Sequence, residues 1–176
     1  MPIKGASKLN AKLAALQKHM ATRLPKLVQA EAVRHFRDNF KLQGFMDGSV
    51  RRWAPTKKGK PGRVLRATGA LQNSIRGGAA SWSRIEIVAG GPDVPYAAIH
   101  NEGGLINRQV TRRPHKRKAH KSRRKGRSVM VGEAMVRRHQ ARMNVVLRRR
   151  QFIGPSKALN VKLRALLVRE INSVMK

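Results

Sequence analysis

His100 and Glu102, two positions apart and close to Tyr96, form the group in this sequence that most resembles a catalytic centre. A histidine exchanges protons near neutral pH, which makes it the usual residue of general acid–base catalysis. One histidine and one glutamate are a weak pattern, however, and such a histidine is more often a buried structural residue. The eight acidic residues are scattered among forty basic ones and are better interpreted as ion-pair partners than as a catalytic carboxylate pair. We predict no catalytic residue and no enzymatic activity; a nuclease, with His100 as its only candidate residue, is the third hypothesis.

Metal and nucleotide binding have no clear signature in the sequence. The chain contains no cysteine, so disulfides and thiolate–metal sites are excluded. His115 and His120 lie inside a basic segment, where the surrounding cations disfavour the binding of another cation. Gly59-Lys60 is followed by Pro61 and therefore does not belong to a phosphate-cradling P-loop. We predict no metal site and no cofactor.

Basic residues are the strongest chemical signal in the chain. Of 176 residues, 40 are Lys or Arg and 8 are Asp or Glu, which gives a formal net charge of +32. Residues 104–151 contain 17 basic residues and one acid, so half of the net charge lies in little more than a quarter of the length. Polyanions, namely DNA, RNA or anionic lipid, are the natural partners of such a chain. The candidate DNA-binding residues are the ten in 112–127: Arg112, Arg113, Lys116, Arg117, Lys118, Lys121, Arg123, Arg124, Lys125 and Arg127.

The segment 112–127 has ten basic residues and no acid, so it cannot form a core of its own, and we expect it to be disordered or extended until an anion neutralises it. Its affinity for nucleic acid would be salt-sensitive and independent of sequence, because it arises from the release of condensed counterions. No aromatic residue lies between Tyr96 and Phe152, so a stacking platform for unpaired bases is absent. The alternative is a solvated loop that keeps the protein soluble, although acidic residues serve solubility better.

The elements that position these residues follow from hydrophobic periodicity. Residues 8–43 are predicted to form two core-facing helices that meet at a kink, because Pro25 removes a backbone donor, with Gly44 as the C-terminal stop. The apolar residues that share a face are Leu9, Leu13, Leu16, Met20 and Leu24 in the first helix, and Val28, Ala32, Phe36 and Phe40 in the second.

The rest of the chain alternates between loops and short elements. Glycine and proline punctuate 44–78, which we expect to be mostly loop with a short helix over 67–75. Residues 82–89, in which apolar and polar residues alternate at 82–87, are predicted to form a half-buried strand, and another element begins at Tyr96. Residues 129–143 favour a helix, whereas 144–147 are open between strand and helix. Ser156 is expected to cap a final helix whose apolar face contains Leu159, Leu163, Leu166, Leu167, Ile171 and Val174.

We therefore predict an α+β fold in which N-terminal helices and a C-terminal helix pack on a small antiparallel sheet, with a long basic loop or extension. We expect the 176 residues to form a single domain whose parts are 8–43 (helices), 44–103 (loop and sheet core), 104–151 (basic insertion) and 152–176 (C-terminal helix). No apolar run approaches the roughly 20 residues that a membrane span needs, and the N-terminus lacks the apolar region of a signal peptide. We expect a soluble intracellular product with no membrane partner.

Four short motifs occur in a fixed order outside the basic insertion. They are W-x-P at Trp53–Pro55, L-x-x-T-G-x-L-x-x-S-I at Leu65–Ile75, Y-A-x-I-H-x-x-G at Tyr96–Gly103 and R-x-F-I-G-x-S at Arg150–Ser156. In this order the chain resembles the tailed-phage virion-morphogenesis, or tail-completion, family. The resemblance covers about residues 27–175 apart from the basic insertion. The motif residues to which it assigns a structural role are Trp53, Pro55, Leu65, Thr68, Gly69, Leu71, Tyr96, His100, Gly103, Phe152 and Gly154.

The resemblance implies a small structural protein of the phage neck, at or near the head–tail junction, with no catalytic role. It also implies assembly, in the host cytoplasm, into a homo-oligomeric ring around the DNA path, for which we expect six copies. The partners would be neighbouring neck and tail proteins and the double-stranded DNA in the channel, with the basic insertion facing the DNA or an acidic neighbour. The chain departs from the family at 148–151, where relatives often carry P-A-R-P and this sequence has three arginines and a glutamine. The runner-up is a general nucleic-acid-binding protein of a ribosomal or chromatin-like kind.

The motif residues also have physical roles that do not depend on the family. Gly69 and Gly103 stand where the chain is expected to reverse direction, and glycine adopts a positive φ there at low cost. Trp53 and Phe152 are expected to anchor loops to the core or to a neighbouring subunit, with the core as the favoured role. The predicted core of the sheet and its short helix consists of Leu65, Leu71, Ile75, Trp82, Ile85, Ile87, Tyr96 and Ile99.

Overall fold

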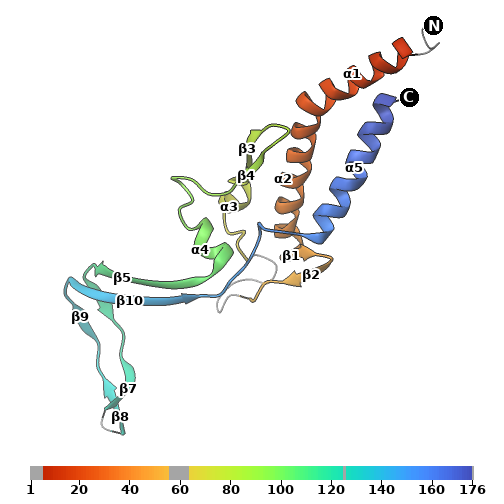
Figure 1. Cartoon of the computed structure of the whole chain (residues 1–176). Helices are drawn as coiled ribbons and strands as arrows, with labels where there is room; N and C mark the ends of the chain where they lie inside the picture. The colour runs from red at the N-terminus through yellow and green to blue at the C-terminus, as the bar shows by residue number, and fades with distance from the viewer. Residues whose placement is uncertain (1–5, 56–63, 125, 176) are drawn as a thin grey trace. The chain divides into compact units, whose positions relative to one another are not determined.

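The computed structural model describes residues 6–55, 64–124 and 126–175. The chain divides into two compact units, one made of Met1–Gly103 with Arg148–Lys176 and the other of Gly104–Leu147. The first unit combines helices with short antiparallel hairpins, and the second consists of strands (Figure 1). The predicted α+β class is confirmed, with the sheet content distributed over separate two-stranded hairpins.

Three long helices form the frame of the first unit. They are α1 (Ala6–Thr22), α2 (Leu24–Leu42) and α5 (Lys157–Met175), and α5 runs beside α1 and α2 (Figure 1). The expected break at Pro25 is confirmed, since Pro25 lies in the first turn of α2, where a missing backbone donor costs nothing. The helix α2 ends with Gln43 in the left-handed conformation, one residue before Gly44.

The apolar stripe of α1 is core-facing only at its C-terminal end. Leu16 and Met20 are half-buried, and Leu24, which begins α2, is buried, but Leu9 is 53% exposed and Leu13 is 43% exposed. The expectation of a fully core-facing first helix is therefore wrong for its N-terminal half. Periodicity identifies residues that share a face, but whether another element covers that face depends on the tertiary arrangement.

Two hairpins and two short helices complete the first unit. The segment expected to be mostly loop contains β1 (Gly44–Asp47) paired with β2 (Ser49–Arg52) around Gly48, so that expectation is wrong for 44–52. The predicted strand at 82–89 is shorter, because Ser81 and Arg84 form a turn and leave Trp82 61% exposed instead of in the core. The remaining elements are α3 (Ala70–Asn73), β3 (Arg76–Ala80) paired with β4 (Ile85–Val88), and α4 (Ala97–Glu102).

The core of the first unit is an aromatic cluster on one side of α2. Phe40 is completely buried, and its ring lies edge-on to Trp53 at 5.3 Å and tilted against Phe152 at 5.4 Å, between ring centroids. Such aromatic pairs stabilise by about 0.5–1.5 kcal/mol beyond the area that they bury. Leu71 and Ile75 join this cluster as predicted, while Tyr96 is 39% exposed, so its assignment to the core is wrong.

The second unit is one long antiparallel ribbon. The register is continuous, since each residue step along one strand is matched by one step on the other from Gly104↔Leu147 to Arg124↔Arg127. Residues 125 and 126 connect the strands; Gly126 has φ +76, as two-residue hairpin turns require, and Lys125 lies outside the described residues. Figure 1 shows the ribbon bending between its two ends. Its strands are β5 (Gly104–Arg112), β6 (His115–Arg117), β7 (His120–Arg124), β8 (Arg127–Val131), β9 (Ala134–Val136) and β10 (His139–Leu147).

This ribbon corrects the expectation of a helix over 129–143. Those residues belong to β8, β9 and β10, and the strand alternative for 144–147 is confirmed. Each strand has a partner in register, and cross-strand pairing outweighs the weak helical preference of a segment that contains several valines. The extended conformation expected for 112–127 is found, in the form of paired strands.

Candidate functional site

The predicted DNA-binding residues all belong to the ribbon segment, and the side chains of those that the structure describes project from both of its faces. Lys121 and Arg123 are two positions apart on β7 and share one face, whereas the adjacent Lys116 and Arg117 on β6 point to opposite faces. Arg112 ends β5, Arg127 begins β8, and Arg113 and Lys118 lie in the connections between strands. Lys125 and the side chain of Arg124 lie outside the described part of the chain.

The charge of the ribbon has almost no internal compensation. Residues 104–147 contain 14 basic residues and a single acid, Glu133. That acid forms an ion pair with Lys116 at 2.9 Å between Nζ and Oε2. Within the described part of the ribbon, the other basic side chains have no acidic partner. The ribbon therefore has a strongly positive potential on both faces.

The ribbon also lacks a core. None of its described residues is buried, and Met130 and Met135 are 63% and 72% exposed. A two-stranded hairpin without a covered apolar face is only marginally stable in water. A partner surface or a bound polyanion would supply the missing burial and charge neutralisation.

The family-motif residues lie in the first unit, where three of the four motifs are hydrogen-bonded to one another. The Trp53 indole donates to the Gln151 carbonyl at 2.7 Å, and Arg150 Nε donates to the Ala54 carbonyl at 3.1 Å. The Asn101 side-chain oxygen accepts hydrogen bonds from the backbone N–H groups of Phe152 and Ile153, at 2.9 and 3.0 Å. We call this set of contacts the motif junction. It joins W-x-P, Y-A-x-I-H-x-x-G and R-x-F-I-G-x-S around a buried Trp53 and a buried Phe152.

The second motif contributes to the same core through apolar packing. Leu71 is 3% exposed, and the half-buried Leu65 packs against the core cluster. Gly69 has φ +80 and Gly103 has φ +76, which confirms the positive φ predicted for both glycines. Thr68 Oγ1 accepts a hydrogen bond from the Ala70 N–H at the start of α3. The remaining motif residues are Pro55, which is exposed, and Gly154, which has φ +153.

His100 does not show the surroundings of a catalytic histidine. Its ring lies edge-on to Tyr96 at 5.6 Å, and its Nδ1 atom is buried without a hydrogen-bond partner among the described residues. Burial lowers its pKa, and the nearby Arg150 lowers it further. Glu102 is exposed, and among the described residues no carboxylate reaches either ring nitrogen of His100. The orienting carboxylate of a general acid–base pair is thus missing from the described surroundings.

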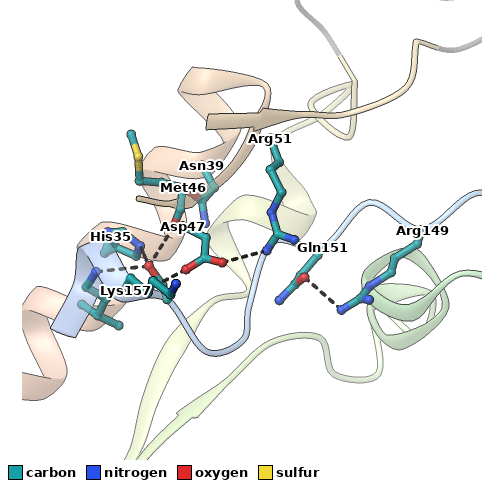
Figure 2. A network of polar contacts seen from close by, with 10 residues as sticks. His35, Asn39, Met46, Asp47, Arg51, Arg149, Gln151 and Lys157 are labelled. Atoms are coloured by element: carbon teal, nitrogen blue, oxygen red, sulfur yellow. Dashed lines mark hydrogen bonds and ion pairs between the residues drawn. The ribbon is translucent and has the colours of Figure 1, made fainter. Parts of the chain in front are cut away.

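A second buried polar network ties α2 to β1 and α5 (Figure 2). Asn39 is completely buried; its amide donates to the Phe152 carbonyl at 3.1 Å and accepts from the Met46 N–H at 3.0 Å. Ser156 Oγ donates to the Met46 carbonyl at 2.7 Å and accepts from the Leu159 N–H, which confirms the predicted cap of α5.

His35 completes this network. Its Nε2 atom lies 3.2 Å from Ser156 Oγ, and because the Ser156 proton is already directed to Met46, the ring is the donor. Burial lowers the pKa of His35, with Lys162 as the next cause, against opposing effects of Met46, Asp38 and Glu31. Sequence reasoning missed Asn39 and His35, whose only signal was a polar residue on the buried face of an amphipathic helix.

Sequence reasoning also missed a group of arginines beside Trp53. Arg51 and Arg52 immediately precede Trp53 in the chain, and Arg149 precedes the fourth motif. All three line one small hollow together with Gln151 and two aromatic side chains. The signal available in the sequence was the pairing of arginines directly next to two motifs whose aromatic residues meet in the core.

In the described part of the chain, no three His, Cys, Asp or Glu side chains are grouped as a metal site would require. None of the described helices is long and apolar enough to cross a membrane. No protein-family model, curated protein or solved structure matched the chain.

Proposed function

We propose that the chain is a structural virion protein of a tailed phage, which completes the neck or tail at the head–tail junction. In this proposal, copies of the chain assemble in the host cytoplasm into a ring of six around the DNA path and contact neighbouring neck and tail proteins. The observation that carries the proposal is the motif junction: three motifs that suggest the family are bonded to one another in one buried frame, apart from the basic ribbon. Residues at such a junction hold a fold together, which is the role that the family resemblance assigns to them.

Exposed apolar side chains support assembly with other copies. Leu9 and Leu13 on α1 and Val161 and Val168 on α5 are between 43% and 67% exposed. Burial of a side chain of this size stabilises by about 1.5–3 kcal/mol, so covering them in a ring would add substantially to a modest core. A closed ring buries such surfaces in every copy and leaves no unsatisfied end.

The ribbon supports contact with DNA. Its basic side chains lie on both faces, and the major groove of DNA, which admits a two-stranded ribbon, has phosphates on both walls. An acidic neighbour would satisfy the same charges. This structural role involves no chemical reaction, so the proposal includes no catalytic residue, metal or cofactor. In this proposal His100 has a packing role.

Electron microscopy of the purified protein tests the proposal. The expected result is annular particles, with a mass by light scattering that corresponds to six chains. A chain that remains monomeric at micromolar concentration, with or without DNA, would contradict it.

The runner-up, a general nucleic-acid-binding protein, is favoured by one observation. Outside the ribbon the chain still has 26 basic and 7 acidic residues, so its charge is not confined to the ribbon. Such a protein would bind RNA tightly as a monomer, and its affinity would depend on basic residues of both units. Analytical ultracentrifugation with a structured RNA separates it from the ring protein by the mass of the bound species.

A further inference from the structure

A small hollow on the first unit gathers three guanidinium groups around two aromatic side chains. Its volume is about 160 Å³, which is well below the roughly 300 Å³ at which pockets for whole small molecules begin. A hollow of this size suits a single ionic group. It is lined by Phe45, Arg51, Arg52, Trp53, Arg149 and Gln151, and we call it the arginine hollow.

Two of the three arginines are held in place by neighbouring side chains. Arg51 Nη2 lies 3.1 Å from Asp47 Oδ2, and its guanidinium carbon lies 5.5 Å from the centroid of the Phe45 ring. Arg149 Nη2 donates to Gln151 Oε1 at 2.9 Å, and Figure 2 shows both contacts as dashed lines between labelled side chains. Guanidinium groups held in this way lose less side-chain entropy when a ligand binds.

The positive charge of the hollow exceeds its negative charge. Asp47 balances Arg51, but Arg52 and Arg149 have no acidic partner within the described residues. Arg150, the next residue along the chain, is only 8% exposed and donates to the Ala54 carbonyl, again without an acidic partner among those residues. The three arginines that line the hollow are exposed, so their attraction for an anion should weaken as the ionic strength rises.

We propose that the arginine hollow binds a phosphate group, which is either a phosphate of a nucleic-acid backbone or a free phosphate ion. Guanidinium forks match the oxygens of phosphate in pairs, and a phosphate offers several acceptors at once. Since Gln151 Oε1 already accepts from Arg149, the Gln151 amide N–H₂ remains as a donor. This site belongs to the first unit and stands independently of the ribbon and of ring assembly.

Trp53 provides a reporter for the experiment, because it lines the hollow and its indole is bonded to Gln151. In a Trp82→Phe background Trp53 is the only tryptophan, and Trp82 is exposed. We would titrate inorganic phosphate at constant ionic strength, following Trp53 fluorescence and the indole N–H resonance. The expected result is a saturable change that becomes at least about tenfold weaker in R52Q/R149Q, since hydrogen bonds from charged groups are lost.

The matched control is R66Q/R164Q, which removes the same charge from exposed arginines that do not line the hollow. R52K/R149K retains the charge but loses the forked geometry of the guanidinium groups, so it should also weaken phosphate binding. If R52Q/R149Q does not fold, R52K/R149K replaces it as the test variant. A response to phosphate that does not saturate, or that falls equally in the control, would overturn the proposal. Saturation by an acidic peptide, with no effect of phosphate, would show a protein-binding surface and would also overturn it.

A short DNA duplex distinguishes the two sources of phosphate. If R52Q/R149Q weakens duplex binding more than R66Q/R164Q does, the site takes a backbone phosphate. If the two variants bind the duplex equally while R52Q/R149Q alone loses inorganic phosphate, the site takes the free ion. Both results support a phosphate site, and neither depends on whether the protein forms a ring.

Discussion

The indole Nε1 of Trp53 donates a hydrogen bond to the main-chain carbonyl of Gln151 at 2.7 Å, although 98 positions separate the two residues. The entire ribbon lies between them in the sequence. The bond is part of the motif junction, which brings the chain segments before and after the ribbon together within the first unit. The junction therefore stabilises the frame and fixes where the basic insertion leaves and re-enters it.

Trp53→Phe should destabilise the protein by about 1–3 kcal/mol, because it leaves the part-buried Gln151 carbonyl without its donor and removes buried aromatic area. The free energy of unfolding in urea measures this effect. Trp82→Phe is the matched control, and because Trp82 is 61% exposed it should change stability by less than about 0.5 kcal/mol. Equal losses of stability in the two variants would show that the hydrogen bond to Gln151 and the burial of Trp53 do not stabilise the fold.

Asn39→Ala should cost about 2–4 kcal/mol. The substitution leaves the buried Phe152 carbonyl and the part-buried Met46 N–H without their Asn39 partner, and a buried group left in this way costs about 1–3 kcal/mol. Asn172 is exposed on α5, and Asn172→Ala is a suitable control in the same urea experiment. A loss below 1 kcal/mol in Asn39→Ala would mean that water or a repacked side chain satisfies both groups.

The sequence predicted the long helices α1, α2 and α5 well because their signals are local. The break at Pro25, the cap at Ser156 and the positive φ of Gly69 each depend on a single residue type with a definite backbone preference. The predictions failed where the outcome depends on distant partners. Leu9 has the correct spacing for a core residue, but no described element buries it. The strand at 129–131 exists because residues 120–122 pair with it.

The candidate sites show the same division. Charge counting located the basic segment of the ribbon, since charge density needs no knowledge of the fold. The arginine hollow was not predicted, because Arg52 and Arg149 are 97 positions apart and meet only through β2 and the segment before α5. Asn39 and His35 were overlooked because a polar residue on an apolar helix face reveals its partners only when the fold brings them together.

Acid should destabilise the protein, and His35 should contribute to this effect. Burial lowers the pKa of His35 below its ordinary value of 6.5, so the unfolded chain takes up a proton at a higher pH than the folded chain does. The stabilising contribution is complete above pH 6.5 and is lost as the pH falls from there towards the folded-state pKa. His100, whose pKa is also lowered, acts in the same direction. Urea unfolding at pH 7.5, 6.5 and 5.5 should show a smaller pH dependence in His35→Gln; identical profiles would exclude His35.

Removal of the ribbon should leave the first unit folded. Arg150 N–H donates to the His100 carbonyl at 2.9 Å, so the chain ends that flank 104–147 are close enough for a short Gly-Ser linker to join them. We expect the shortened chain to retain a cooperative urea transition and the fluorescence emission typical of a buried tryptophan at Trp53. Loss of cooperativity would show that the frame depends on the ribbon.

Serine substitutions in the ribbon should weaken DNA binding in proportion to the phosphate contacts that are lost. Each phosphate neutralised by Lys or Arg contributes about 0.9 to the slope of log K against log salt concentration. Lys121, Arg123 and Arg127 lie beside the tip of the ribbon, and their replacement by Ser should reduce the slope by up to about 2.7.

The control replaces three exposed arginines of the first unit, Arg23, Arg66 and Arg164, and should change the slope by less. If the proposed function holds, extension of the substitution to six or more of the ten basic residues in 112–127 should leave the proposed ring intact while virions retain their DNA less well. Equal slopes in the two triple variants would instead favour the general nucleic-acid-binding protein, whose whole surface contacts the polyanion.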